Sequence, residues 1–392
     1  MRNGKKRIWA LMSAAVTTSA LVVSMTGSSV TTVRDADGDG RYTGSDAQLT
    51  LRYLNGEFNP SSVRSFDFDG NGIISYVDAL KVLGYYSGSF NDASLPGPVG
   101  ADSQAIATTR TYVRHYFNNN VTNPVTEYSL TVNPYDNTNT SPNANSQQRL
   151  IIGENDMIID NDTAVVCLCD TNSGNGYGSG FIISDHIIVT AAHCVFNYSY
   201  HTSSTYDNFK VKLTDNNNNT IYGTPEYVDI PKNYATRGDN NFDYALIYVE
   251  EDLSEYGSFQ LGAVLDEYID NNGEVTVSGF PATSGYPDEY IDQPSDLRFK
   301  ATGKLLPPNS EISPSKDVIL MYDADMTFGD SGGPVYVHES FTTQSDSYDY
   351  NTVIGINTRE WEDSYYQIKE NRGIRITPDH LKFYNDNPYI EY

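Results

Sequence analysis

The chain has 392 residues, enough for two or three domains, and its formal net charge is −26. A chain this acidic repels nucleic acid and anionic lipid, so both are poor candidates for its partners. Hydrophobic residues make up 39% and charged residues 19% of the sequence, which suits globular domains joined by polar connections. The acidity fits an extracellular, soluble, cation-binding protein.

Residues 1–29 have the pattern of a secretory signal peptide. Basic residues stand at positions 2, 5, 6 and 7, an apolar run extends from Ile8 to Met25, and small residues at 27–29 offer a cleavage site. An uncleaved membrane anchor is the alternative, but Ser and Thr residues interrupt the run. We therefore expect a secreted, extracellular protein with no membrane span after signal removal.

An internal repeat follows, in which Asp35–Asp46 recurs as Asp67–Asp78. Both twelve-residue loops place oxygen-bearing side chains at positions 1, 3, 5, 9 and 12, with Gly40 or Gly72 at the sharp bend of position 6. This pattern predicts two Ca²⁺ ions, and a pair of acidic solvated turns is the alternative. The predicted ligands, with backbone carbonyls at position 7, are Asp35, Asp37, Asp39, Arg41, Thr43, Asp46, Asp67, Asp69, Asn71, Ile73, Ser75 and Asp78.

Each loop precedes a helical pattern, and neither follows one, which departs from an EF-hand. The segment from Val33 to Tyr86, within a domain that we place at 30–88, resembles the dockerin module of cellulosome components. The resemblance implies calcium-dependent folding and binding to a cohesin module on a scaffold protein. It also assigns cohesin contacts to loop positions 10 and 11, which are Gly44 and Ser45 in one repeat and Tyr76 and Val77 in the other.

The two pairs at positions 10 and 11 differ, so we expect one binding face to dominate. The alternative is a module that binds calcium only to stay folded and has lost its partner.

Residues 89–149 are rich in Pro, Asn, Thr and Ser, which predicts a linker or propeptide. Within this region, Ala107 to Phe117 has the pattern of a short strand or helix. From Leu150 onward, short apolar runs alternate with polar turns, which predicts a sandwich or barrel over 150–392. Only Pro378–Tyr384 has a helical pattern in this second part.

Three motifs in the β region predict a catalytic triad. Ser331 lies in Gly-Asp-Ser-Gly-Gly-Pro, where a tight glycine-flanked turn presents a nucleophile and lets the amides of Gly329 and Ser331 form an oxyanion hole. His193 ends an apolar strand in Thr-Ala-Ala-His-Cys, and Asp243 precedes the apolar run that starts at Tyr244. The chain order His, Asp, Ser is that of chymotrypsin-like enzymes.

These motifs, together with Gly178-Ser179-Gly180, resemble a trypsin-like serine peptidase of the bacterial glutamyl-endopeptidase, or V8-like, branch. The resemblance implies an all-β double β-barrel with the triad in the cleft between barrels, preceded here by the small all-α dockerin module. It implies a protein or peptide substrate and no cofactor for catalysis. Two alternatives stay open, namely a catalytically inactive peptide-binding module and an esterase on the same barrel.

The resemblance also points to three candidate residues of the substrate pocket. Asp325 stands where trypsins place the acid that binds Lys or Arg, and Asn357 replaces the histidine that glutamyl endopeptidases commonly carry. Arg359 would supply positive charge to an acidic side chain if it points inward, and a solvated surface arginine is its alternative. The preferred residue at the cleaved bond therefore stays open.

The segment around Arg149 and Leu150 resembles the mature amino terminus of this family, which implies a zymogen cut after one of these residues. In the trypsin branch, the new ammonium pairs with the acid before the serine, here Asp330. A plain linker junction is the alternative. The three cysteines, at positions 167, 169 and 194, leave at least one thiol unpaired within the chain, and Cys194 could reach either of the others.

Overall fold

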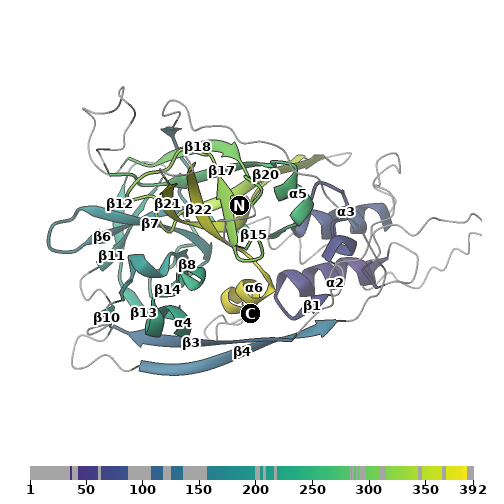
Figure 1. Cartoon of the computed structure of the whole chain (residues 1–392), viewed down its shortest axis with the longest axis horizontal. Helices are drawn as coiled ribbons and strands as arrows, with labels where there is room; N and C mark the ends of the chain where they lie inside the picture. Colours follow the sequence, from purple (N-terminus) through teal and green to yellow (C-terminus); the bar gives the residue numbers. More distant parts are fainter. Residues whose placement is uncertain are drawn as a thin grey trace, which may run out of the picture.

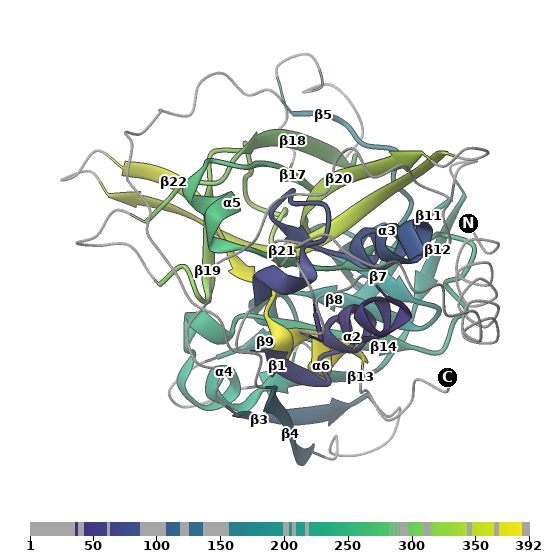
Figure 2. The ribbon, with the colours of Figure 1, turned by 90° about the vertical axis from the view of Figure 1, so that its right-hand side faces the viewer.

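The computed structural model describes two large β-sheets with a helical region at one end (Figures 1 and 2). The described residues are 36–37, 43–60, 63–86, 107–117, 125–135, 157–198, 204–205, 209–215, 219–282, 284, 287, 290, 297–308, 315–342, 347–363 and 368–385. The expected signal peptide and the expected cut near Arg149 lie outside them. Within these ranges, no helix has the length and apolarity needed to cross a bilayer.

The helical region consists of α2 (Gly44–Leu54) and α3 (Tyr76–Tyr86), with the short elements β1 (Phe58–Pro60), η1 (Val63–Phe66) and β2 (Ile73–Ile74) between them. Helix α2 begins with a capping box. The Thr43 side chain accepts a hydrogen bond from the backbone of the first turn, and the Asp46 side chain accepts one from the Thr43 backbone amide. The two helices pack against each other around aromatic side chains, including Tyr53 stacked on Phe66 at 5.3 Å between ring centroids.

The first sheet has ten strands in the order β1-β4-β3-β13-β14-β8-β7-β6-β11-β12. Most of its central strands are apolar and buried, which is why they were predictable from short hydrophobic runs. Besides β1, the members are β3 (Thr108–Tyr116), β4 (Val125–Tyr135), β6 (Val165–Asp170), β7 (Gly176–Ser184), β8 (Ile187–Thr190), β11 (Phe209–Thr214), β12 (Thr220–Gly223), β13 (Pro225–Pro231) and β14 (Ala245–Val249).

The second sheet has eight strands in the order β19-β22-β21-β20-β17-β18-β5, with β15 paired to β21. Its members are β5 (Ile158–Ile159), β15 (Gln260–Leu261), β17 (Glu274–Gly279), β18 (Phe299–Lys304), β19 (Ile319–Tyr322), β20 (Pro334–Thr342), β21 (Ser347–Asp363) and β22 (Ile368–Arg375). The remaining elements are η2 (Ala192–Cys194), β9 (Phe196–Asn197), β10 (Ser204–Thr205), α4 (Lys232–Arg237), η3 (Asn240–Phe242), β16 (Ala263–Val264), α5 (Asp266–Asp270) and α6 (Pro378–Asn385). The mostly β architecture with a small helical N-terminal region is the predicted fold class.

The structure differs from the sequence prediction at the expected linker. Strand β3 pairs with β13 and strand β4 pairs with β3, so the segment before Leu150 contributes two long strands to the first sheet. Arg114 on β3 donates two hydrogen bonds to Asp229 on β13, at 2.7 and 2.6 Å, and its guanidinium lies over the Tyr227 ring. A buried bidentate ion pair of this kind makes the hairpin an integral part of the sheet.

The helical region packs directly onto the β-sheets. Strand β2 pairs with β16, and β1 pairs with β4. Helix α6 lies between the two regions (Figure 1), where Phe383 stacks on Tyr112 at 4.1 Å and Asn385 donates to the Leu54 carbonyl. One hydrophobic core therefore runs from the helical region into the first sheet.

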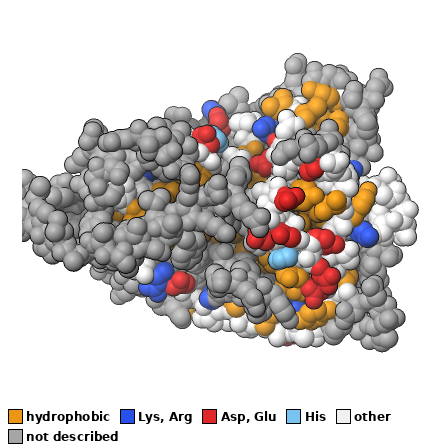
Figure 3. All heavy atoms as spheres, turned by 180° about the vertical axis from the view of Figure 1, so that it is seen from behind, with side chains coloured by type: hydrophobic (Ala, Val, Ile, Leu, Met, Phe, Trp, Pro, Cys, Tyr) orange, Lys and Arg blue, Asp and Glu red, His pale blue; other side chains and the backbone are white. Residues whose placement is uncertain are grey.

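The three cysteines are buried, and no disulfide joins any two of them. The face opposite to that of Figure 1 carries more acidic than basic side chains among its described residues (Figure 3), in keeping with the net charge of −26.

Candidate active site

The base and the acid of the predicted triad come from two neighbouring strands of the first sheet. Strands β8 and β14 are antiparallel, with Thr190 opposite Ala245, so His193 just after β8 meets Asp243 just before β14. Asp243 holds His193 twice, because its Oδ2 lies 2.8 Å from the ring Nδ1 and its Oδ1 accepts the His193 backbone N–H at 2.9 Å. The structure therefore brings this predicted pair together.

The surroundings of His193 set its charge. Burial lowers the pKa of the imidazole, but the Asp243 carboxylate at its Nδ1 outweighs that effect and raises the pKa well above its ordinary value of 6.5. The Asp243 side chain is only 5% exposed, whereas that of His193 is 37% exposed. The His193 imidazole is thus held by a buried carboxylate on one side, while part of the ring is exposed to solvent.

Ser331, the predicted nucleophile, lies on a tight turn between β19 and β20. Gly332 has a φ of +89°, and a Cβ there would lie 2.1 Å from the Ser179 carbonyl oxygen, so only glycine fits. The Ser331 hydroxyl donates to the Thr358 carbonyl oxygen at 3.1 Å. Ser331 and His193 are both among the described residues, and in this rotamer no hydrogen bond joins the Ser331 hydroxyl to His193.

The predicted oxyanion donors are the backbone amides of Gly329 and Ser331. Neither amide has an acceptor among the described residues, although Asp330 between them donates to the Thr327 carbonyl. Gly329 has a φ of +102°, and its carbonyl accepts the Ser179 hydroxyl at 2.8 Å. Two neighbouring donors without acceptors, on a turn fixed from behind, match what a developing oxyanion requires.

Asp330 is fully buried behind the nucleophile. Its Oδ2 accepts the Thr327 amide at 2.9 Å, while its Oδ1 has no hydrogen-bond partner. Burial raises the pKa of this carboxyl from 3.8 to about 8. A buried carboxyl oxygen without a hydrogen-bond partner is costly in free energy, whether the group is charged or neutral.

The three predicted pocket residues have different surroundings. Asn357 is 3% exposed, its Nδ2 donates to the Asp330 carbonyl and its Oδ1 accepts the Tyr322 hydroxyl. Its side chain thus contacts the turn that carries Ser331, and its role in the substrate pocket stays a prediction. Asp325 is half-buried. Arg359 is also half-buried, and its Nη1 is a buried atom without a hydrogen-bond partner.

Sequence reasoning missed Ser179 and Thr358. The Ser179 amide donates to the Ser331 carbonyl at 2.7 Å and its hydroxyl accepts the Phe280 amide at 2.8 Å, so this residue of β7 ties the first sheet to the turn. Its only sequence signal was the flanking pair of glycines. Thr358 acts through its backbone carbonyl, which no side-chain pattern can reveal.

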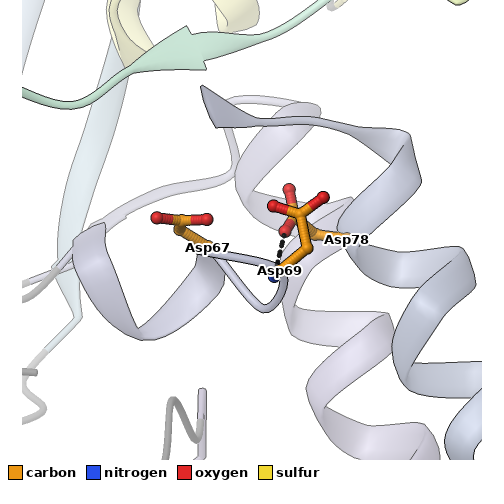
Figure 4. A group of neighbouring side chains, drawn as sticks. All are labelled: Asp67, Asp69 and Asp78. Carbon is orange, nitrogen blue, oxygen red and sulfur yellow. Dashed lines mark hydrogen bonds between the residues drawn. The ribbon is translucent and has the colours of Figure 1, made fainter. Parts of the chain in front are cut away.

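The second predicted calcium loop brings its acids together. Asp67, Asp69 and Asp78 point toward one another (Figure 4), with carboxylate oxygens within 4.8 Å. Gly72 has a φ of +85° at the bend, as predicted for position 6. The ammonium of Lys81 lies against Asp69 at 2.5 Å, which shows that the cluster accepts positive charge. This set of hard oxygen donors fits a calcium ion.

Further features of the loops agree with this fit. Burial, followed by the carboxylates of Asp69 and Asp67, raises the pKa of Asp78 well above its ordinary value. In the first loop, Asp46 accepts the amides of Ala36 at 2.9 Å and Thr43 at 2.7 Å. The predicted ligands Asp35, Asp39 and Arg41 of that loop lie outside the described residues.

The predicted cohesin contacts have unequal access. Gly44 and Ser45 at the start of α2 are exposed. At the start of α3, Tyr76 is half-buried and Val77 is 1% exposed.

The comparisons with known proteins agree with the two resemblances. Residues 178–340 match the family model of the trypsin-like peptidase domain, and residues 33–85 match that of the dockerin type I domain. A solved structure of a Glu endopeptidase in complex with MPD is 17% identical, covers 60% of this chain and 98% of its own, and has a TM-score of 0.44. A search of curated proteins found no match.

Proposed function

From a chain that carries a trypsin-like peptidase domain and a dockerin type I domain, we propose a secreted serine endopeptidase that a cohesin tethers to an extracellular scaffold. One observation carries the enzymatic part of this proposal. The His193–Asp243 pair, joined by two hydrogen bonds, lies on one sheet. Ser331 and two amides without acceptors lie on a turn that contacts Cys194, the neighbour of His193, through the Ser331 carbonyl at 3.4 Å.

The mechanism that this geometry supports is acyl-enzyme hydrolysis of a peptide bond. The Ser331 hydroxyl rotates from the Thr358 carbonyl towards His193, gives its proton to the imidazole and attacks the scissile carbonyl carbon. The amides of Gly329 and Ser331 stabilise the oxyanion, and the imidazolium then protonates the leaving amine. Asp243 accepts the hydrogen bond from the His193 Nδ1–H throughout, so that Nε2 is the nitrogen that takes and gives the proton. Water repeats the cycle on the acyl-enzyme.

Fluorophosphonate labelling of the secreted protein beside its Ser331→Ala variant tests the nucleophile. We expect covalent labelling of the wild type only, and a loss of peptidase activity of about 10⁶-fold in the variant. A folded wild-type protein that fails to label, both intact and after cleavage, would leave the inactive peptide-binding module as the better explanation. Hydrolysis of small esters but of no member of a peptide library would favour the esterase.

We further propose that cohesin binds through the first repeat. The start of α2 presents Gly44 and Ser45 to solvent, whereas Val77 is buried and Tyr76 packs against the core. Calorimetric titration with a cohesin module should show at least a 100-fold loss of affinity for Ser45→Arg and little change for Tyr76→Ser. The reverse order of effects would assign binding to the second repeat.

Processing after Arg149 or Leu150 is the remaining part of the proposal. It is supported by the buried Oδ1 of Asp330, which has no partner in the uncut chain and would accept a new ammonium. Amino-terminal sequencing of the labelled species should find a start at Leu150 or Ile151. A secreted, labelled protein that has lost only its signal peptide would contradict the processing step.

A further inference from the structure

A carboxylate of the peptidase region reaches into the second calcium loop. Glu339 lies on β20 and is 6% exposed. Its Oε1 accepts hydrogen bonds from Asn71 Nδ2 at 3.0 Å and from Ser75 Oγ at 3.1 Å. Its Oε2 accepts the Thr352 hydroxyl at 2.5 Å, which fixes the carboxylate from the peptidase side.

The two loop residues that Glu339 contacts stand at positions 5 and 9, which the loop pattern assigns to calcium ligation. Asn71 and Ser75 both contact Glu339 as hydrogen-bond donors, so this contact uses no oxygen lone pair of either residue. The Asn71 amide therefore directs its oxygen back into the loop, where it accepts the Ile73 amide at 2.7 Å. The Ser75 oxygen accepts the Val77 amide at 3.0 Å and keeps its second lone pair. Carboxylates that orient ligands in this way raise metal affinity without touching the metal.

The backbone of the same loop also docks on the peptidase region. Ile73 and Ile74 pair with Val264 and Ala263, and the Gly72 carbonyl accepts the Leu265 amide at 2.9 Å. The bend that brings the calcium ligands together is thus part of the contact between the two regions. A change in the loop conformation on loss of the ion would therefore alter the β2–β16 pairing and the Leu265–Gly72 hydrogen bond.

We propose that Glu339 is an outer-shell residue of the second calcium site, supplied by the peptidase region, and that calcium binding and docking of this loop are coupled. Since coupling free energies are reciprocal, calcium strengthens the docking by the same factor by which docking strengthens calcium binding. This coupling concerns stability and assembly, and it does not depend on whether Ser331 is catalytic.

Calorimetric calcium titration of the full chain tests the first half of this coupling. Ser331→Ala serves as the background, which removes self-cleavage. Adding Glu339→Gln should weaken one class of calcium site by about 10- to 100-fold and leave the other class as an internal reference. The matched control is His338→Gln, on the same strand with its side chain 61% exposed, which should bind calcium as the background does. Unchanged binding at both sites in a folded Glu339→Gln protein would overturn the proposal.

Hydrogen exchange over residues 263–269 tests the reciprocal half. Calcium removal should speed exchange of the Leu265 amide in the background protein, and Glu339→Gln should reduce the difference between the two states. If Glu339→Gln does not fold, Thr352→Val removes the bond that fixes the Glu339 carboxylate from the peptidase side and should give the same trend. Exchange at Leu265 that is independent of calcium in the background protein would also overturn the coupling.

Discussion

The two halves of the candidate site are built differently. His193 and Asp243 occupy the ends of paired strands in one sheet, and two hydrogen bonds already fix their mutual geometry. Ser331 lies on a turn that contacts from both sheets hold in place, and its hydroxyl bonds to Thr358 and not to the imidazole. Strand pairing alone is enough to assemble the base, whereas the nucleophile depends on several contacts between residues that are distant in sequence.

The difference extends to unsatisfied groups. The base half has its charged partner in place, while the nucleophile half buries an Asp330 oxygen without a donor. Cleavage near Arg149 would therefore act on the turn around Asp330, because a new ammonium could pair with the Asp330 oxygen there. The following predictions address each half in turn.

The largest effect is expected from breaking the base half with Asp243→Asn. The asparagine carries no negative charge and has only one accepting oxygen, so it cannot hold both the backbone N–H and the ring Nδ1–H of His193. We therefore expect kcat to fall by about 10⁴-fold. Because Asp243 raises the pKa of His193, the wild-type kcat/KM should rise with pH through an inflection above 6.5, and the variant's inflection should move to lower pH. Steady-state rates measured across pH, with far-UV circular dichroism as the folding control, check both points. An unshifted inflection would mean that another group titrates.

The nucleophile half should show the next largest effect, through Asp330. Its pKa is raised from 3.8 to about 8 in the folded uncut chain, so the folded state binds more protons than the unfolded state between these values. Stability should therefore fall as pH rises through this window, with a slope of at most about 1.4 kcal/mol per pH unit.

Asp330→Asn should remove that slope from the uncut protein, as measured by urea unfolding at a series of pH values. In a cut form whose new ammonium pairs with Asp330, the slope should be absent from the wild type as well. An uncut wild type whose stability is flat over this window would contradict the buried, unpaired carboxyl.

A new covalent link would test how closely the base half packs against the neighbouring strand β7. A Cβ at Gly178 would lie 3.3 Å from the Cys194 Cβ and 2.9 Å from its Sγ, slightly closer than an ordinary disulfide requires. Gly178→Cys should therefore form a disulfide with Cys194, next to His193, and raise the free energy of unfolding by about 3 kcal/mol when oxidised. Thiol titration and unfolding with and without reductant measure this. Three free thiols beside the new one after oxidation would show that the strain is too great.

The smallest effect is expected from Ser179→Ala, which removes the hydroxyl that bonds the Gly329 carbonyl and the Phe280 amide. The groups left behind are buried, so the stability loss should be about 1–3 kcal/mol. The rate of fluorophosphonate labelling should fall as well, because Gly329 carries an oxyanion donor. A loss of stability with an unchanged labelling rate would make Ser179 purely structural.

Local sequence patterns predicted the residues whose chemistry depends on immediate neighbours. His193, Asp243 and Ser331 lie in motifs of strand ends and glycine turns, and the second calcium loop closes within twelve residues. Strand β3 was ambiguous because its buried Arg114 gains its role from Asp229, which lies 115 residues away along the chain.

Glu339 and Asn357 fall outside local patterns for the same reason. Each carries out its role through contacts with segments far along the chain, namely the calcium loop for Glu339 and Tyr322 for Asn357. The pattern around Asn357 suggested a pocket because it marks the right strand, but it does not say which way the side chain points.

The β3–β4 hairpin changes what a cut chain would be. It lies on the amino-terminal side of the expected cut, yet it pairs with β13, and Arg114 and Tyr128 both bond Asp229. Cleavage after Arg149 would therefore yield a nicked, two-fragment particle, with one fragment supplying strands to the sheet of the other. The backbone would then no longer join the enzyme to the scaffold. The lifetime of this tether would be the half-life for dissociation of the two fragments, which depends on how fast β3 separates from β13.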